Sequence, residues 1–191
     1  MTPAPLAKLD ILTVGYATHH VASTCTLIRD GEKTIVVDPG MVADRSLLLD
    51  PLSRLGVGTA DVTDVVISHH HPDHTLNVAL FPKARVHDVF ATYDRDLWID
   101  HDPGDFVVSP SVGLTPTPGH TDQDLTTLVH TEAGLIALTH LWWDASGPAD
   151  DPFAPDQTIL SASRKRILAM GPALIVPGHG AAFAPTADTP S

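Results

Sequence analysis

The chain has 191 residues, 43% of them hydrophobic and 5% aromatic, which suits one globular domain that buries about 70% of its unfolded surface. Its formal charge of −12, from 23 acidic and 11 basic residues, repels phosphate backbones and makes nucleic acid an unfavourable partner. Cys25 is the only cysteine, which excludes an intrachain disulfide, and no apolar run approaches the roughly 18 residues of a membrane span, so we expect a cytoplasmic protein.

The first third of the chain is rich in β-branched and apolar residues. Because the segment 30–33, Asp-Gly-Glu-Lys, is a typical turn, these residues predict an antiparallel meander of strands. The predicted strands cover 9–16, 21–29 and 34–38. Leucines at helical spacing then predict a helix from about Asp44 to Gly56, and a further strand follows over 64–68.

The second half alternates short strands with turns before one long amphipathic segment. Strands are predicted around 84–87, 105–109, 112–117, 126–131, 134–139 and 173–177, with a helix over 156–170. Strands outnumber helices and no linker separates the halves, so an α/β (α+β) fold with two sheets packed face to face and helices outside is expected. We expect one domain over 1–183 and a flexible tail over 184–191.

The segment Ser68–His74, "SHHHPDH", follows an apolar strand and is the strongest chemical signal in the chain. His69 and His71 leave an extended backbone on the same side and can share one metal ion, whereas His70 points away. Asp73 and His74 follow the turn at a proline and can face a second ion. Imidazole nitrogens together with a carboxylate favour zinc over calcium or magnesium.

Three further histidines occur at the ends of predicted strands. His120 lies in "TPGHT", His140 ends "ALTH", and His179 lies between two glycines in "VPGHG", which leave room for a metal ion or a substrate. We expect all three near the metal cluster. The isolated histidines are expected to be ordinary surface or core residues; they are His19, His20, His87, His101 and His130.

The motifs "VVDPG" at 36–40, "HHHPDH" at 69–74, "PGHT" at 118–121 and "PGHG" at 177–180 resemble those of the metallo-β-lactamase superfamily. Within it, their order is similar to that in the group of metallo-β-lactamase domain-containing protein 1. The resemblance implies a four-layer αβ/βα sandwich with the site at one edge of the sheets. It also implies a first metal held by His69, His71 and His120, a second held by Asp73, His74 and His179, and Asp38 as a hydrogen-bond partner beneath them.

The sequence departs from the family at the position of the carboxylate that usually bridges both metals, where it has Thr139-His140. An imidazole cannot bridge two ions unless it loses both ring protons. This leaves open whether His140 binds one ion or none, and whether two ions are held. Asp144 is an alternative source of the carboxylate.

These features predict a metal-dependent hydrolase that uses two zinc ions, with iron or manganese as alternatives, to activate water. Asp73 is the expected catalytic residue, which orients the nucleophile and passes a proton to the leaving group. The expected substrate is a small ester, thioester or lactone. Alternatives are a metal-dependent endoribonuclease or phosphodiesterase, a mononuclear iron oxygenase or redox protein, and a scaffold without turnover.

The expected partner is a small-molecule substrate, without nucleic acid or membrane, and a homodimer is compatible with the sequence. Three aromatic-containing loops are predicted to overhang the site, over 16–24, 91–105 and 141–153. The basic run Arg164-Lys165-Arg166 is predicted to be solvated helix surface.

Overall fold

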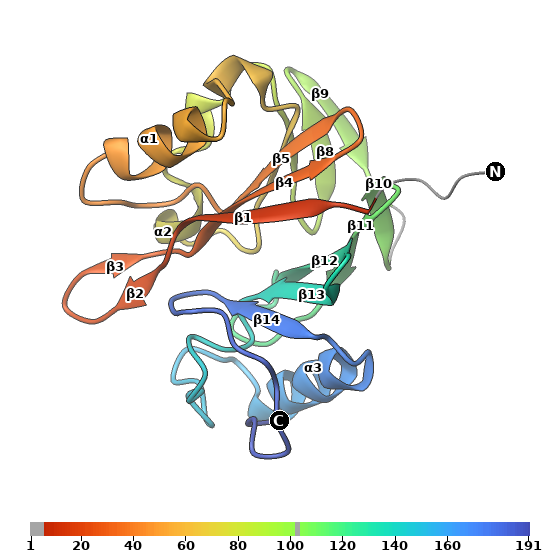
Figure 1. Ribbon diagram of the computed structural model, residues 1–191. Helices are drawn as coiled ribbons and strands as arrows, with labels where there is room; N and C mark the ends of the chain where they lie inside the picture. Colours follow the sequence, from red (N-terminus) through yellow and green to blue (C-terminus); the bar gives the residue numbers. More distant parts are fainter. Residues whose placement is uncertain (1–5, 102–103) are drawn as a thin grey trace.

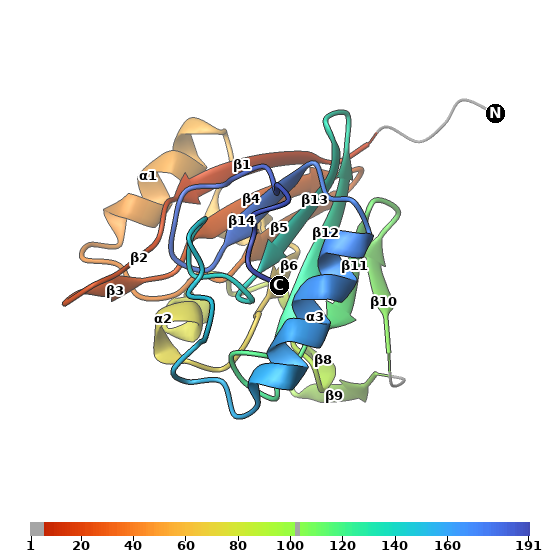
Figure 2. The same ribbon diagram turned by 90° about the horizontal axis from the view of Figure 1, so that it is seen from below.

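The computed structural model describes residues 6–101 and 104–191. Two β-sheets pack face to face, and a helix covers the outer face of each, so that four layers are seen in Figure 1. Figure 2 shows α3 lying over the outer face of the second sheet. The expected αβ/βα sandwich is confirmed. In the described parts of the chain, no helix is long and apolar enough to cross a membrane.

The larger sheet has seven strands in the order β1-β4-β5-β6-β7-β8-β9. These are β1 (Lys8–Thr13), β4 (Cys25–Asp30), β5 (Lys33–Val37), β6 (Asp64–Val66), β7 (Arg85–His87), β8 (Ala91–Asp94) and β9 (Leu97–Asp100). The predicted meander is confirmed, because β1, β4 and β5 pair antiparallel. The central strands β5, β6 and β7 are parallel, and their carboxyl ends therefore meet at one edge of the sheet.

The second sheet has five strands in the order of the chain. These are β10 (Phe106–Ser109), β11 (Val112–Pro116), β12 (Leu125–Thr131), β13 (Gly134–Thr139) and β14 (Leu174–Pro177). Strands β13 and β14 run parallel because α3 (Gln157–Ala169) crosses between them. A separate hairpin of β2 (Tyr16–Ala17) and β3 (Val21–Ala22) projects from the sandwich (Figure 1). The remaining helices are α1 (Ser46–Arg54), α2 (Pro72–Thr75), η1 (Thr59–Asp61) and η2 (Val78–Leu80).

Alternating apolar residues of both sheets form the central core, in which Ile28, Ile35 and Val66 meet Leu114 and Val129. Two smaller clusters attach the helices: Leu48 and Leu52 of α1 lie in one, and Leu160 and Ile167 of α3 lie in the other. These side chains are buried, so each helix is held by the apolar stripe that its sequence spacing predicts.

Two expectations for this part of the structure are wrong. Residues 91–100 do not overhang the site but form β8 and β9, which extend the larger sheet at its edge. Their turn contains Arg95 with φ +58° in place of the usual glycine or asparagine. The sequence therefore lacks the residues that normally indicate a hairpin turn. Arg164 is buried and donates three hydrogen bonds, to the carbonyl oxygens of Leu141, Pro148 and Ala149, instead of lying in solvent. The division of the chain at residue 183 stays a prediction.

Candidate metal centre

The predicted metal ligands all follow the ends of strands at one edge of the sandwich. His69 and His71 follow β6, and Pro72 opens the short helix α2, which carries Asp73 and His74. The other three come from the second sheet: His120 lies between β11 and β12, His140 follows β13, and His179 follows β14. Two sheets therefore contribute to one cluster.

The first group consists of His69, His71 and His120, whose ligand atoms lie within 4.8 Å of one another. His71 Nδ1 is 3.0 Å from His69 Nε2 and 3.2 Å from His120 Nε2. Three ring nitrogens that converge in this way can hold one ion and leave a coordination position open. The grouping agrees with the one that the family resemblance implies.

The second group consists of Asp73, His74 and His179. Asp73 Oδ2 lies 3.3 Å from His74 Nε2 and 3.6 Å from His179 Nε2. The Nε2 atom of His74 is buried and has no hydrogen-bond partner among the described residues. A buried nitrogen without such a partner is costly unless an ion or a proton occupies the position, so this group fits a metal ion.

His140 lies between the two groups and not outside them. Its ring centroid is 4.1 Å from that of His120 and 4.6 Å from that of His69, and its Nε2 is 3.0 Å from His179 Nε2. His140 also forms a compact set of ligand atoms with His69 and His74. The residue therefore occupies the position expected of a ligand, with one nitrogen available toward the cluster.

Asp38 lies beneath the cluster, as the resemblance implies. Its Oδ1 accepts a hydrogen bond from the Ser68 backbone N–H at 2.7 Å, and its Oδ2 is 2.8 Å from His74 Nδ1. The backbone of Asp38 has φ +52°, a conformation that is strained for a residue with a side chain. The carboxylate fixes the His74 ring so that Nε2 faces the cluster.

The sequence did not indicate Asp151, which holds the ring of His120 from behind. Asp151 is fully buried, and its Oδ2 lies 2.8 Å from His120 Nδ1 and accepts a hydrogen bond of 2.8 Å from Trp143 Nε1. Its Oδ1 accepts a hydrogen bond from the Phe153 N–H. All three neighbours use a carboxylate oxygen as acceptor, so Asp151 orients a predicted metal ligand and an aromatic residue together.

Asp124 shapes the turn that presents His120 and was also not predicted. It accepts hydrogen bonds from the backbone N–H groups of His120 and Thr121. Burial raises the pKa of Asp124 to about 6, although these hydrogen bonds oppose the change. The turn after "TPG" is thus fixed by a buried carboxyl group four residues beyond the histidine.

The protonation state of four histidines of the cluster favours metal binding, and His74 differs from them. Burial, reinforced by neighbouring imidazoles, lowers the pKa of four of these histidines, which are His69, His71, His140 and His179. Neutral imidazoles are the form that binds a metal ion. Burial alone would lower the pKa of His74, but the charge of Asp38 and a hydrogen bond to it, together with the charge of Asp73, raise it to about 9.

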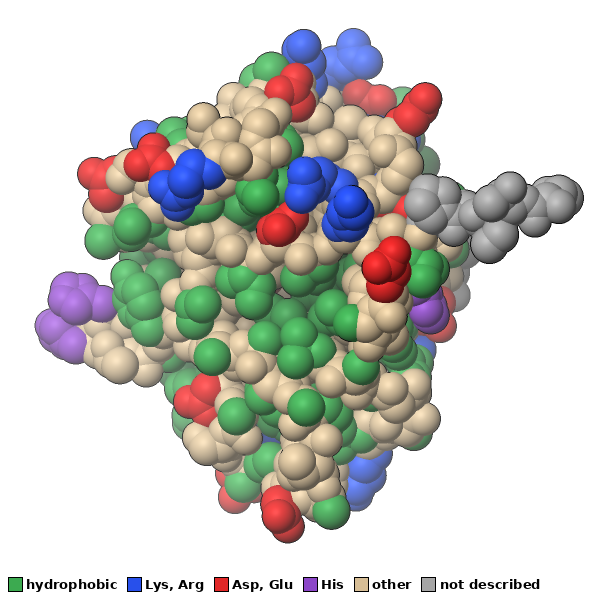
Figure 3. Space-filling model, in the orientation of Figure 1, with side chains coloured by type: hydrophobic (Ala, Val, Ile, Leu, Met, Phe, Trp, Pro, Cys, Tyr) green, Lys and Arg blue, Asp and Glu red, His purple; other side chains and the backbone are tan. Residues whose placement is uncertain are grey.

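Other sequence candidates lie outside the cluster. Asp144 is exposed, and its carboxylate accepts hydrogen bonds from Ser146 in a turn, so it does not supply the carboxylate that His140 replaces. His70 points away and pairs with Asp88 at 2.9 Å. The exposed pair His19 and His20 lies at the tip of the β2–β3 hairpin, where Figure 3 shows histidines projecting from the molecule.

A cavity of about 510 Å³ opens onto the cluster. The β2–β3 hairpin and the segment after β13 contribute apolar and aromatic groups to it, as predicted for 16–24 and 141–153. Its lining consists of Ala17, Thr18, Val21, His71, Asp73, His120, Trp143, Phe153 and His179. Trp143 and Phe153 stack with ring centroids 5.8 Å apart. The predicted ligands thus form one side of a pocket whose other side is apolar.

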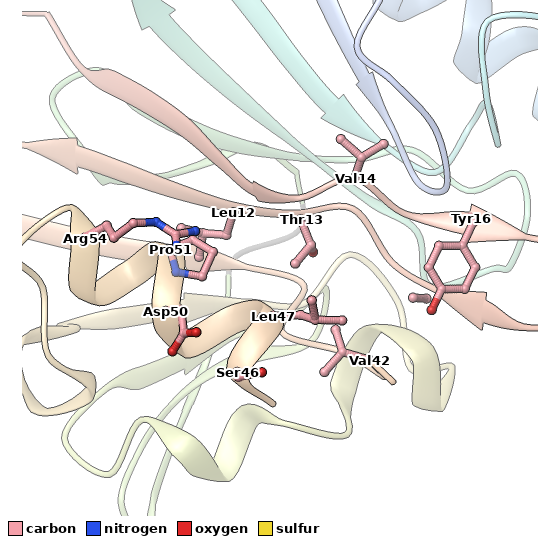
Figure 4. A pocket seen from close by; sticks show the side chains of 11 residues that line it. Leu12, Thr13, Val14, Tyr16, Val42, Ser46, Leu47, Asp50, Pro51 and Arg54 are labelled. Carbon is pink, nitrogen blue, oxygen red and sulfur yellow. The ribbon is translucent and has the colours of Figure 1, made fainter. Parts of the chain in front are cut away.

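A different cavity, of about 400 Å³, lies between β1 and α1 (Figure 4). Leu12 and Val14 face it from the strand side, and Leu47 and Pro51 from the helix. Its lining includes no histidine. The predicted metal ligands therefore line the cavity beside the histidine cluster and not this one.

The His140 ring occupies the space beside Gly178 where any other residue would have its side chain. Substitution of Gly178 is therefore expected to disturb His140. A Cβ atom at Gly178 would lie 2.3 Å from His140 Cδ2, so Gly178→Ala must displace the His140 ring. We expect a loss of stability of about 1–3 kcal/mol from overpacking and weaker metal binding, measured by thermal unfolding and by metal content. Gly113→Ala is the control, because its nearest neighbour would be Phe106 O at 3.8 Å. Unchanged metal content in Gly178→Ala would contradict the position assigned to His140.

A second prediction concerns Asp151→Asn. Asparagine has one acceptor oxygen and a donor amide, so it must turn a donor toward at least one of the donors that His120, Trp143 and Phe153 present. We expect metal affinity to fall about 10- to 100-fold, measured by competition with a chelator. The neighbouring exposed carboxylate gives a matched control, Asp150→Asn. Equal affinities of the two variants would show that Asp151 does not support the centre.

The fold and the histidine-rich centre define a metal-dependent enzyme of the αβ/βα sandwich class. The sequence profile of the metallo-β-lactamase superfamily matches residues 20–127. The chain belongs to the metallo-β-lactamase superfamily and is a metallo-hydrolase. It is similar to metallo-β-lactamase domain-containing protein 1 of Xenopus laevis, with 33% identity over 166 residues that cover 83% of this chain and 70% of that protein. The human protein of that name is 33% identical over 78% of this chain, but the match spans only 59% of its length.

Solved structures share the fold at low sequence identity. A quorum-quenching N-acyl homoserine lactone hydrolase superposes with a TM-score of 0.69 and 21% identity, with 92% of each chain covered. A chemotaxis sensor, described as a peroxy diiron species, superposes with a TM-score of 0.68 and 16% identity over 94% of this chain and 86% of the sensor. At these identities the similarity establishes the sandwich fold.

Proposed function

We propose that this protein is a zinc hydrolase that acts on a small neutral ester, thioester or lactone. The observation that carries the proposal is the character of the 510 Å³ cavity. Its polar side is made of predicted metal ligands and its other side of apolar and aromatic groups. None of the described residues that line it is a lysine or arginine. A neutral substrate with an apolar acyl group suits these walls better than a polyanion.

His69, His71 and His120 would hold one ion, and Asp73, His74 and His179 a second, with His140 as a further ligand between them. Six imidazoles and one carboxylate form a donor set that suits zinc, and also iron or manganese. When bound, zinc lowers the pKa of water toward 7 and supplies a nucleophile at neutral pH. The residues of the chain would hold the ions in place and transfer the proton.

Asp73 is proposed as the group that handles the proton. Burial would raise the pKa of Asp73, but the charges of His74 and His179 lower it to about 2. The carboxylate is therefore ionised at neutral pH and can accept a proton from the attacking water. As the water oxygen bonds to the carbonyl carbon and the C–O or C–S bond breaks, Asp73 returns the proton to the departing alkoxide or thiolate.

The aromatic side of the cavity is proposed to bind the acyl group. Trp143 is fixed by its hydrogen bond to Asp151, and Phe153 stacks on it with 25° between the ring planes. A rigid aromatic wall binds an apolar chain with little loss of side-chain entropy. An endoribonuclease or phosphodiesterase is the second candidate function. It is less favoured than the hydrolase, because the described lining of the cavity has no cationic side chain that could bind a phosphodiester.

A substrate panel tests this proposal. The metal-loaded protein is assayed with lactones and thioesters of short and long acyl chains and with a short RNA. We expect turnover of the neutral substrates, and Phe153→Ala should lower kcat/KM about tenfold for long acyl chains and less for short ones. Phe90→Ala, at an exposed phenylalanine that does not line the cavity, is the control. Cleavage of RNA without turnover of any neutral substrate would overturn the proposal.

An iron redox protein, which belongs to a different chemical class, is the third candidate function. It is favoured by the replacement of the usual bridging carboxylate by His140 and by the shared fold of the diiron sensor. Metal analysis of protein purified without added metal separates the two candidates. Zinc at one or two equivalents supports the hydrolase, whereas a stoichiometric iron content with an absorption change on exposure to oxygen supports the redox function.

A further inference from the structure

A second concentration of charge lies at the opposite edge of the larger sheet. Lys33 and Arg85 begin β5 and β7, Lys83 precedes β7, and Arg95 lies in the β8–β9 turn. These four residues line a cavity of about 510 Å³, whose lining contains one acidic residue, Asp94. The whole chain has 11 basic and 23 acidic residues, so more than a third of its cations surround this one cavity. The charged residues that line this cavity are therefore mostly positive, whereas the molecule as a whole is negative.

A buried carboxylate holds two of these cations in place. Asp64 has no exposed surface, and its Oδ2 lies 2.8 Å from Lys33 Nζ, whereas its Oδ1 lies 3.3 Å from an Arg85 nitrogen. His87 Nε2 is 2.8 Å from the same Oδ1. An ammonium has three N–H donors and a guanidinium five, so each cation keeps donors that Asp64 does not use. The floor of the cavity is thus pre-organised, unlike a patch of mobile surface lysines.

The other two cations are available to a ligand. Lys83 forms no ion pair with any residue that the structure describes. Arg95 pairs with Asp94 at 3.1 Å, but its side chain is 86% exposed, and such a pair contributes little. Four cations against the carboxylates of Asp64 and Asp94 leave an excess of two positive charges. This excess matches a dianion.

The cavity is separate from the metal centre. Strand β6 begins at Asp64, next to the cationic cavity, and the chain reaches the first predicted metal ligand, His69, five residues later. At about 3.3 Å per residue, five residues of extended chain span up to about 16 Å. A ligand bound here would lie at the amino-terminal edge of the parallel strands, away from the histidines.

We propose that this cavity binds a small phosphate dianion, either free or carried by a small organic molecule. Guanidinium groups bind phosphate oxygens in pairs, and ammonium groups add charge. A nucleic acid is not favoured, because the remaining surface of the chain is acidic and would repel neighbouring phosphates. The binding site rests on the four side chains and does not depend on the hydrolase activity.

The test is a titration of the metal-loaded protein, followed by amide chemical shifts. Inorganic phosphate is one arm and glycerol phosphate the other, and sodium chloride at matched ionic strength is the reference. We expect saturable shifts at the amides of Thr63, Lys83 and Arg95. The lower of the two dissociation constants shows whether the site prefers free phosphate or an organic phosphate. Amides of the histidine centre are followed separately, because phosphate can also bind a metal there.

The double variant Lys83→Ala/Arg95→Ala should weaken phosphate binding about tenfold or more, because two charge-assisted contacts are lost. The control Lys8→Ala/Lys165→Ala removes the same charge from exposed positions outside the cavity and should leave binding unchanged. Hydrolase activity should be unaffected in both variants. The proposal fails if the chloride reference produces the same shifts, if no saturable shift occurs at these amides, or if both double variants weaken binding equally.

Discussion

Asp73→Asn is expected to lower kcat about a thousandfold while the protein remains folded. An amide cannot accept the proton of the attacking water, and general base catalysis is worth about 10²- to 10⁴-fold. The substitution also removes the negative charge that faces His74 and His179 at 3.3 and 3.6 Å. Steady-state kinetics on the best neutral substrate, with metal content measured on the same sample, check the prediction.

The control for this experiment is Asp144→Asn, which changes an exposed carboxylate in a turn outside the cluster. It should leave kcat within about twofold of the parent, as is usual for surface substitutions. If Asp73→Asn keeps full activity with full metal content, the proton must be handled elsewhere and the role proposed for Asp73 is wrong.

His140→Asp is expected to tighten binding of the second metal ion by about tenfold to a hundredfold. The His140 ring is packed among His69, His120 and His179, so a side chain at this position faces both groups of ligands. A carboxylate has two oxygens that can contact two ions and adds a negative charge to a site made mostly of neutral nitrogens. Metal stoichiometry after dialysis and affinity by chelator competition measure the change.

His130→Asp is the matched control, because His130 is exposed at the end of β12 and belongs to none of the compact groups of ligand atoms. It should leave both measurements unchanged. Equal metal content in His140→Asp and the parent, with two ions in each, would show that the imidazole already completes the second site.

Much of the architecture could be predicted from local patterns. Apolar alternation located most strands, and leucine spacing located α1, because both reflect burial of one face. The β8–β9 hairpin was missed because its turn is made by Arg95 in a left-handed conformation without glycine. Arg164 was misjudged because a basic run usually lies in solvent, whereas three carbonyl oxygens surround this guanidinium.

The candidate site was predictable to the extent that ligands carry local motifs. His69, His71 and His74 lie in one short segment, and strand ends brought the later histidines to the same edge. Asp151 has no such signal, since nothing in the sequence separates it from its neighbour Asp150. The cationic cavity could not be predicted from the sequence either, because its residues come from distant segments that only the folded sheet brings together.

The histidine centre draws its donors from both layers of the sandwich: from the segment after β6 on one side, and from those after β11, β13 and β14 on the other. An ion bound there acts as a cross-link between the two halves of the polypeptide. Above the dissociation constant, each tenfold rise in free metal then adds about 1.4 kcal/mol to the free energy of unfolding. Depletion of metal is therefore expected to lower the free energy of unfolding as well as the activity, because the ligands of each sheet are then no longer joined through the ion.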